Sequence, residues 1–217
     1  MVITIDGPAG TGKSTAARGL AARLGFEVLD TGAMYRAVAL AAMRRTISLH
    51  DAEALSELLR NVRLDFRSGQ MLLDGEDVST AIRQPEIAQA ASQVAAVPLV
   101  RQHLVRLQRQ AAEGRNIVAE GRDQGTVVFP DAAVKFFLTA SPQARAERRR
   151  RELASRGLER DLGDILAEQA ERDHRDSTRQ VAPLTPAPDA IVIDTTHRSI
   201  DDVLALMEQY VRPWLTR

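Results

Sequence analysis

The chain has 217 residues, of which 44% are hydrophobic and 4% aromatic, and its 29 basic and 29 acidic residues give a formal net charge of +0. The length suits one α/β domain with an insertion, or two small domains. The balanced charge and few aromatic rings argue against a nucleic-acid partner, and the lack of cysteine excludes disulfides and thiolate zinc sites. Neither an apolar run long enough to span a membrane nor a charged leader is found, so we expect a soluble cytoplasmic protein.

The first motif follows Val2-Ile3-Thr4-Ile5, an apolar run typical of a buried parallel strand. The next segment, Gly7-Pro8-Ala9-Gly10-Thr11-Gly12-Lys13-Ser14, fits the phosphate-loop pattern G-x-x-x-x-G-K-[ST] at every fixed position. Glycines permit the tight turn in which N–H groups face one anion, the lysine reaches β- and γ-phosphates, and the serine hydroxyl suits Mg²⁺. Apolar residues at helical spacing then predict a helix whose N-terminus adds its dipole to the phosphate site.

A second strand is predicted over residues 26–29, and a helix follows with Thr31 as its expected N-cap. Two interpretations of this segment stay open. In the first, its polar residues line a second pocket, because ligands bind at the carboxyl ends of strands in open α/β sheets. In the second, they form a capping motif with a solvated arginine. The residues concerned are Asp30, Thr31, Tyr35 and Arg36.

The pattern changes from about residue 50. A helix is predicted over 51–61, and strands with alternating polarity follow at 62–66, 71–73 and 76–78, separated by Gly-containing turns. We interpret this small antiparallel unit as an insertion over residues 62–96, whose second part forms short helices.

Pro98 is expected to open a helix that reaches about residue 113. The third strand of the main sheet, 116–119, ends at Glu120-Gly121-Arg122-Asp123. Folding alone gives little reason for this set of charges at the end of a strand. The position favours a ligand role over a surface salt bridge, which would contribute little. An apolar loop over 125–130 and a fourth strand over 134–138 follow.

Ser141 is predicted to cap an arginine-rich helix, on which Arg145, Arg148 and Arg149 share one face. This face either closes over polyphosphate or is an ordinary solvated face. The two interpretations have similar weight.

The next predicted helix covers 161–176. Near its end stand Arg172, Asp176 and Arg179, spaced i, i+4 and i+7, and these side chains project the same way if the helix continues to residue 179. A fifth strand over 191–194 and a terminal helix from Ser199 complete the pattern. The sum is a P-loop phosphotransferase with a second, arginine-rich pocket. Several arginines imply an acceptor that is itself anionic, because arginine binds phosphate in a bidentate manner.

Five segments carry a family resemblance. They are the phosphate loop at 7–14, Asp30-Thr31-Gly32-Ala33-Met34-Tyr35-Arg36, Ala91-Ser92-Gln93-Val94-Ala95, Gly121-Arg122-Asp123-Gln124-Gly125-Thr126-Val127-Val128-Phe129-Pro130 and Glu171-Arg172-Asp173-His174-Arg175-Asp176. Together they resemble the bacterial cytidylate kinases, a family of P-loop nucleoside monophosphate kinases, over nearly the whole chain.

This resemblance implies an α/β fold, a P-loop kinase with a five-stranded parallel sheet flanked by helices. A small antiparallel insertion would bind the monophosphate, and a short helical segment would form a lid. The expected organisation is a single domain over 1–217, with core segments 1–61, 97–140 and 177–217, the insertion 62–96 and the lid 141–160.

The implied reaction moves the γ-phosphoryl of ATP, with Mg²⁺, to CMP or dCMP, in a cytoplasmic monomer that binds neither nucleic acid nor membrane. The implied ATP-binding residues are Gly7, Pro8, Ala9, Gly10, Thr11, Gly12, Lys13, Ser14 and Thr15. The implied catalytic residues are Lys13, Arg145, Arg148 and Arg149, and the implied metal-binding residues are Ser14 and Asp30. The implied CMP-binding residues are Thr31, Tyr35, Arg36, Ser92, Arg101, Arg122, Asp123, Arg172, Asp176 and Arg179.

The chemistry of cytosine agrees with these roles. Its N4 amino group donates, which suits the carboxylate of Asp123. Its N3 and O2 atoms accept, which suits Arg101 and Ser92. Uracil would place an acceptor opposite the carboxylate, so we expect it to be a poorer substrate.

Two other classes stay open on the sequence. A GTPase-type switch is disfavoured because the chain has no N-K-x-D segment for guanine. A nucleic-acid-dependent ATPase is disfavoured by the charge balance and the few aromatic residues. Among kinases, the alternative acceptors are other nucleoside monophosphates or a small metabolite such as shikimate.

Overall fold

The computed structural model describes residues 1–67 and 69–215 of the chain. It forms two compact units, one made of Met1–Val28 and Gly114–Arg217 and the other of Leu29–Glu113. The second unit contains the expected insertion, residues 62–96, together with helices on either side of it in the sequence.

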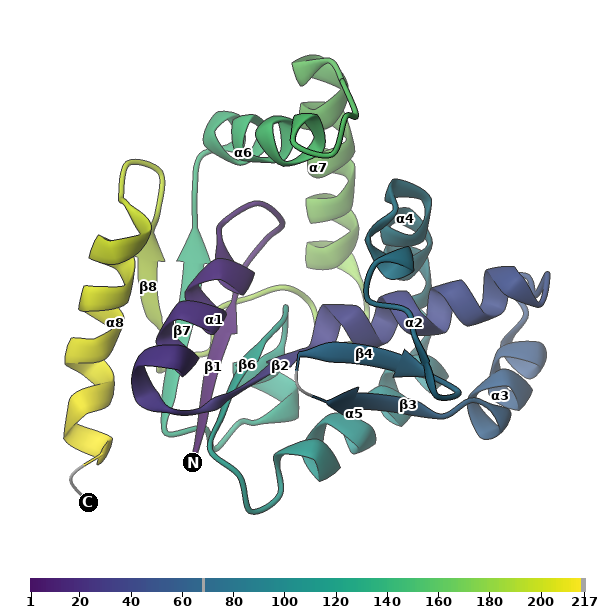
Figure 1. Cartoon of the computed structure of the whole chain (residues 1–217), viewed down its shortest axis with the longest axis horizontal. Helices are drawn as coiled ribbons and strands as arrows, with labels where there is room; N and C mark the ends of the chain where they lie inside the picture. The colour runs from purple at the N-terminus through teal and green to yellow at the C-terminus, as the bar shows by residue number, and fades with distance from the viewer. Residues whose placement is uncertain (68, 216–217) are drawn as a thin grey trace. The chain divides into compact units, whose positions relative to one another are not determined.

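The first unit is built on a parallel sheet with the strand order β2-β6-β1-β7-β8 (Figure 1). The strands are β1 (Val2–Asp6), β2 (Glu27–Asp30), of which the first half belongs to this unit, β6 (Ile117–Glu120), β7 (Val134–Thr139) and β8 (Ile191–Asp194). Strand β1 lies in the centre, in parallel register with β6 on one side and β7 on the other. The predicted five-stranded parallel sheet is confirmed.

Alternation along β1 separates the core from the site. Ile3 and Ile5 are fully buried in one cluster with Leu20 of α1 (Lys13–Leu24) and Met207 of α8 (Ile200–Leu215). Successive side chains of a strand point to opposite faces, so the buried Thr4 and Asp6 lie on the other face. The strand therefore holds a polar residue at the carboxyl end of the sheet while its apolar side anchors two helices.

Two further helices, α6 (Pro142–Ala154) and α7 (Leu162–Thr178), pack against each other through a small apolar cluster of Ala146, Leu153 and Ile165. Ser141 caps α6 as predicted, because its Oγ accepts a hydrogen bond from the N–H of Ala144 at 3.2 Å. The apolar loop expected after β6 instead contains a π-helical turn, η2 (Gln124–Val128).

The second unit combines helices with the predicted antiparallel strands. Its elements are α2 (Thr31–Arg44), α3 (Ala52–Asn61), β3 (Leu64–Arg67), β4 (Gln70–Leu73), β5 (Glu76–Asp77), the short helix η1 (Ala81–Arg83), α4 (Pro85–Val94) and α5 (Pro98–Ala112). The strands form a separate sheet in the order β3-β4-β5, with antiparallel pairing throughout. The Ser68-Gly69 turn expected between β3 and β4 lies partly outside the described residues.

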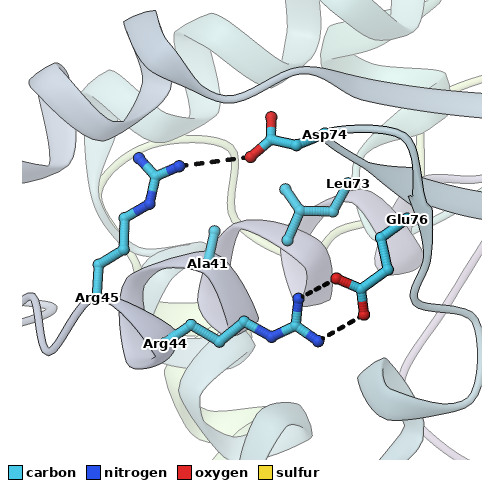
Figure 2. A pocket seen from close by; sticks show the side chains of 6 residues that line it. All are labelled: Ala41, Arg44, Arg45, Leu73, Asp74 and Glu76. Carbon is cyan, nitrogen blue, oxygen red and sulfur yellow. Dashed lines mark hydrogen bonds and ion pairs between the residues drawn. The ribbon is translucent and has the colours of Figure 1, made fainter.

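The C-terminal end of α2 is tied to the turn between β4 and β5 by two ion pairs (Figure 2). Arg44 donates to both oxygens of Glu76, at 2.6 and 2.8 Å, and Arg45 lies 3.4 Å from Asp74. A shallow pocket of about 180 Å³ lies between these pairs. Because the pairs are exposed to solvent, they orient the small sheet on α2 more than they stabilise it.

The close approach of Gly7 to β7 generates a stability prediction. Gly7 has φ +141°, and a Cβ atom there would lie 2.1 Å from the carbonyl oxygen of Leu138. We expect Gly7→Ala to lower the free energy of unfolding by more than about 3 kcal/mol, because backbone would have to move. Gly25→Ala is the matched control, since Gly25 also has a positive φ but a Cβ there meets nothing within 4 Å. It should cost about 1 kcal/mol. Equal losses in urea unfolding would contradict the steric argument.

Candidate active site

The phosphate loop connects β1 to α1 and has the backbone that its glycines allow. Gly7, Gly10 and Gly12 all have positive φ angles, of 141°, 78° and 90°. The first turn of α1 carries no acidic side chain, which leaves the positive end of the helix dipole available to an anion. Lys13 is only 6% exposed, and its Nζ donates to the carbonyl oxygen of Pro8 at 2.6 Å. The side chain of Lys13 thus lies against the phosphate loop, where it is expected to bind phosphate.

Side chains from α6 and from the end of β8 hold the loop by its carbonyl groups. Arg145 donates to the oxygen of Ala9 at 3.1 Å, and Arg148 donates to that of Gly10 at 3.4 Å. The hydroxyl of Thr195 lies 3.0 Å from the oxygen of Thr11. Three successive loop carbonyls are therefore contacted by groups outside the loop, which fixes its conformation.

The three arginines predicted to share a face of α6 have different surroundings. Arg145 is buried and pairs with Asp173 at 2.6 Å, and Arg148 also donates to the hydroxyl of Thr195 at 3.0 Å. Arg149 pairs instead with Glu152 on its own helix, at 2.9 Å. Two of the three thus lie against the phosphate loop. The solvated-face interpretation does not describe Arg145 or Arg148.

A buried carboxylate stands at the carboxyl end of β1. Asp6 is 4% exposed, and its two oxygens accept the backbone N–H groups of Gln124 at 2.9 Å and Gly125 at 2.8 Å. Burial raises the pKa of Asp6 to about 6, since the hydrogen bonds and the charge of Lys13 only partly offset the loss of solvation. Burial also lowers the pKa of Lys13 well below its usual value, and the nearby cationic Arg122 lowers it further.

A cationic cluster surrounds the buried Asp176. Arg122 donates its Nε–H to Asp176 at 3.0 Å, and Arg179 lies 3.9 Å from Asp176 and 3.7 Å from Asp123. Burial by itself would raise the pKa of Asp176, but Arg122, Arg172 and Arg179 outweigh it and hold the pKa below its usual value. The structure thus brings together the predicted residues of two separate segments of the first unit, Arg122 and Asp123 from one and Arg172, Asp176 and Arg179 from the other.

The helical continuation assumed for Arg179 is wrong. Helix α7 ends at Thr178, and Arg179 is its C-cap with an extended backbone, φ −62° and ψ 141°. From this cap position the side chain lies 3.9 Å from Asp176, and its Nε–H donates to the carbonyl oxygen of Ala182 in the loop that follows. The predicted proximity therefore holds for a different reason.

The sequence-predicted residues of the second unit cluster at the start of α2 and on α4 and α5. The N-cap of α2 is Asp30 and not Thr31, because Asp30 accepts the N–H of Ala33 at 2.8 Å and also pairs with Arg36 at 3.1 Å. Arg36 is paired and not freely solvated. The guanidinium of Arg101 lies 5.6 Å from the centre of the Tyr35 ring, a cation–π contact. Thr31, Ser92 and Arg101 are all buried.

Some buried polar residues of the first unit were missed from the sequence, among them Asp6, Lys135 and Thr195. Asp6 directly precedes the phosphate loop, and Lys135 interrupts the apolar strand Val134-Lys135-Phe136-Phe137-Leu138. A charge inside such a strand is a signal in itself, because unpaired charges are rarely buried.

A parallel sheet, a phosphate loop between its central strand and the next helix, and clustered arginines at the strand ends define a P-loop phosphotransferase. The cytidylate kinase family model matches residues 3–213. A cytidylate kinase from Mycobacterium leprae is 51% identical, with 98% of this chain and 96% of the relative covered. One from Shewanella piezotolerans is 49% identical, with 94% and 92% covered. The chain belongs to the cytidylate kinase family, as its motifs predicted.

A solved structure adds only a likeness of fold. An uncharacterized protein from Eubacterium ventriosum matches with a TM-score of 0.52 at 13% identity, over 98% of both chains. Among the helices within residues 1–67 and 69–215, none combines the length and the apolar character needed to span a bilayer.

Asp6 generates a prediction about pH. Its folded-state pKa of about 6 lies above the ordinary 3.8, so the folded protein binds more protons between these values. Its contribution to stability is therefore greatest below about pH 4 and is lost as the pH rises through 6. Asp6→Asn cannot ionise. We expect the free energy of unfolding of the wild type, relative to this variant, to fall by up to about 3 kcal/mol between acidic and neutral pH. Urea unfolding of both proteins across this range measures it, and a constant difference would contradict the assignment.

Proposed function

We infer that the protein transfers the γ-phosphoryl group of ATP to CMP or dCMP, giving ADP and CDP or dCDP. Membership of the cytidylate kinase family supports this reaction. One structural observation supports it most directly: Arg145 and Arg148 contact carbonyl groups of the phosphate loop, and Arg122 and Arg179 lie around the buried Asp176. Cationic groups of this kind are what a site for two phosphorylated ligands requires.

In the proposed reaction a phosphate oxygen of CMP attacks the γ-phosphorus of ATP. A new P–O bond forms, the bond to the β–γ bridging oxygen breaks, and ADP leaves with that electron pair. Little covalent chemistry falls to the protein, so positioning and charge neutralisation dominate. Lys13 would exchange the carbonyl oxygen of Pro8 for phosphate oxygens, whose negative charge favours its protonated form.

The proposed ATP-binding residues are those of the loop and the first turn of α1, namely Gly7, Pro8, Ala9, Gly10, Thr11, Gly12, Lys13, Ser14 and Thr15. Within the described residues, no group of three or more acidic or histidine side chains could hold a metal. We propose that Mg²⁺ is held by the ATP phosphates together with Ser14 and Asp30. The carboxylate of Asp30 also accepts the N–H of Ala33 and pairs with Arg36. When bound, the ion withdraws charge from the β- and γ-phosphates.

We propose that the acceptor phosphate is bound by Arg122, Arg172 and Arg179, while Asp176 binds its ribose and Asp123 its base. Asp123 is only 3% exposed, so a base that it contacts would be read away from water. The other CMP-binding residues that we propose all belong to the second unit, namely Thr31, Tyr35, Arg36, Ser92 and Arg101. Tyr35 supports this role by packing beneath Arg101, which orients the guanidinium.

We further propose that segment 141–160 acts as a lid and that Arg145, Arg148 and Arg149 neutralise charge during transfer. Arg145 and Arg148 support this proposal, because they already contact the phosphate loop. The enzyme would act as a cytoplasmic monomer on free nucleotides and would not bind nucleic acid.

Release of ADP in a coupled assay tests the reaction and the role of Lys13 together. With ATP and Mg²⁺, we expect turnover on CMP and dCMP, less on UMP and none on shikimate. Lys13→Met should lose most of kcat because the transferred phosphoryl loses a neutralising charge, by roughly a hundredfold or more. The melting temperature confirms that the variant is folded. A folded variant with near-normal turnover would refute the role of Lys13, and turnover on shikimate alone would refute the proposed acceptor.

Asp123→Asn tests the reading of the base. The amide keeps the size of the side chain but can also donate, so it accommodates O4 of uracil where the carboxylate cannot. We expect kcat/KM for CMP to fall by an amount equivalent to about 1–3 kcal/mol of lost transition-state stabilisation, while activity on UMP rises relative to that on CMP. The measurement is kcat/KM for both acceptors in both proteins. An unchanged ratio would mean that Asp123 serves its neighbour Arg179 and does not read the base.

A further inference from the structure

Lys135 is a lysine in the middle of the sheet. It lies on β7 between Val134 and Phe136, next to the central strand β1, and is only 8% exposed. Its Nζ donates to both carboxylate oxygens of Asp189, at 2.9 and 2.8 Å. Burial of an ammonium group is costly unless it is paired. The buried ammonium group of Lys135 therefore depends on its contact with Asp189, in the loop between α7 and β8.

The same side chain supports the turn that follows Asp123. A Cβ atom on Gly125 would lie 3.2 Å from Cδ of Lys135, so the lysine stem passes directly behind this turn. The same turn is also held by the hydrogen bond from the Gly125 N–H to Asp6. The stem of Lys135 thus lies close to Gly125, two residues after Asp123, which is proposed to read the base.

The loop that Asp189 belongs to also carries the contacts of Arg179. Arg179 donates its Nε–H to the carbonyl oxygen of Ala182 at 2.5 Å, and the N–H of Leu184 donates to the carbonyl oxygen of Asp176 at 2.8 Å. Three prolines stand between Ala182 and Asp189, at positions 183, 186 and 188. Each fixes its own φ angle and restricts the residue before it. A constraint at Asp189 is therefore transmitted along a stiff segment to the carbonyl that holds Arg179.

We propose that the Lys135–Asp189 ion pair is a positioning element of the acceptor site, which fixes the 179–189 loop so that Arg179 stays beside Asp123 and Asp176. The inference rests on the proposed function, because it concerns binding of the acceptor nucleotide. Neither residue of the pair touches the substrate in this proposal. Their effect reaches it through Arg179 and through the turn at Gly125.

The test compares Lys135→Met, Asp189→Ala and the double variant with the wild type. Met keeps the apolar stem against Gly125, and Asp189 is exposed enough to be replaced without disturbing the core. The matched control is Asp201→Ala, which removes another exposed carboxylate from an ion pair, with Arg23 at 2.9 Å, on α8. The readouts are KM for CMP, KM for ATP, kcat, and the dissociation constant of CMP by titration calorimetry.

We expect KM and the dissociation constant for CMP to rise about tenfold in both single variants, since a small displacement of a binding group has effects of this order. KM for ATP should stay within about twofold, because the phosphate loop is held by α6 and Thr195. The double variant should lose no more than either single one, since the two residues act as a pair. The Asp201→Ala control should behave as the wild type.

Three results would overturn the inference. One is CMP binding within twofold of the wild type in both single variants. Another is an equal rise in KM for CMP and ATP, which would indicate general loosening of the fold. The third is additive losses in the double variant. If the wild type itself has no activity on CMP, the proposed function fails and this inference fails with it, whereas unchanged variants of an active enzyme overturn the inference alone.

Discussion

The structure of the site depends on the carboxylate of Asp6. This residue ends β1 and directly precedes Gly7, and its two oxygens accept the N–H groups of Gln124 and Gly125. The phosphate loop and the turn after Asp123 are therefore held together by one side chain. An amide could accept only one of these bonds, and an alkyl group neither. The raised pKa of Asp6 is the cost of placing this acceptor in the core, where its charged form is poorly solvated.

Several cationic side chains of the first unit have partners within the protein. Lys13 donates to a loop carbonyl, Arg122 to Asp176, and Arg145 pairs with Asp173. These partners hold the positive groups in fixed places, so that on the proposed function phosphates would meet a preorganised site. A bound phosphate would then replace existing hydrogen bonds of these groups. The cationic groups are thereby kept in defined positions by partners and are not left as buried, unpaired charges.

Local patterns in the sequence were sufficient for the phosphate loop, the strands and most helix limits. Local patterns could not decide the N-cap of α2, because Asp30 and Thr31 are adjacent and both residue types are good N-caps. In the structure Asp30 caps the helix and also pairs with Arg36. Arg179 lies near Asp176 as expected, although the helix ends at Thr178 and does not continue to it. Lys135 and Thr195 were missed because their partners lie 54 and 184 residues away along the chain. Strand order likewise depends on contacts that no local window contains.

On the proposed function, Asp123 serves two partners in turn. In the structure it faces Arg179 at 3.7 Å, and both side chains are buried. An incoming phosphate attracts Arg179, and the carboxylate can then satisfy its acceptors through the amino group of cytosine. Phosphate binding and base reading are coupled in this way, because a buried carboxylate is costly without a donor. Uracil offers no donor at this position, so on this proposal selectivity would depend on the hydrogen bond from cytosine N4 to Asp123 and not on the shape of the base. The loop that carries Arg179 therefore matters for selectivity as well as for affinity.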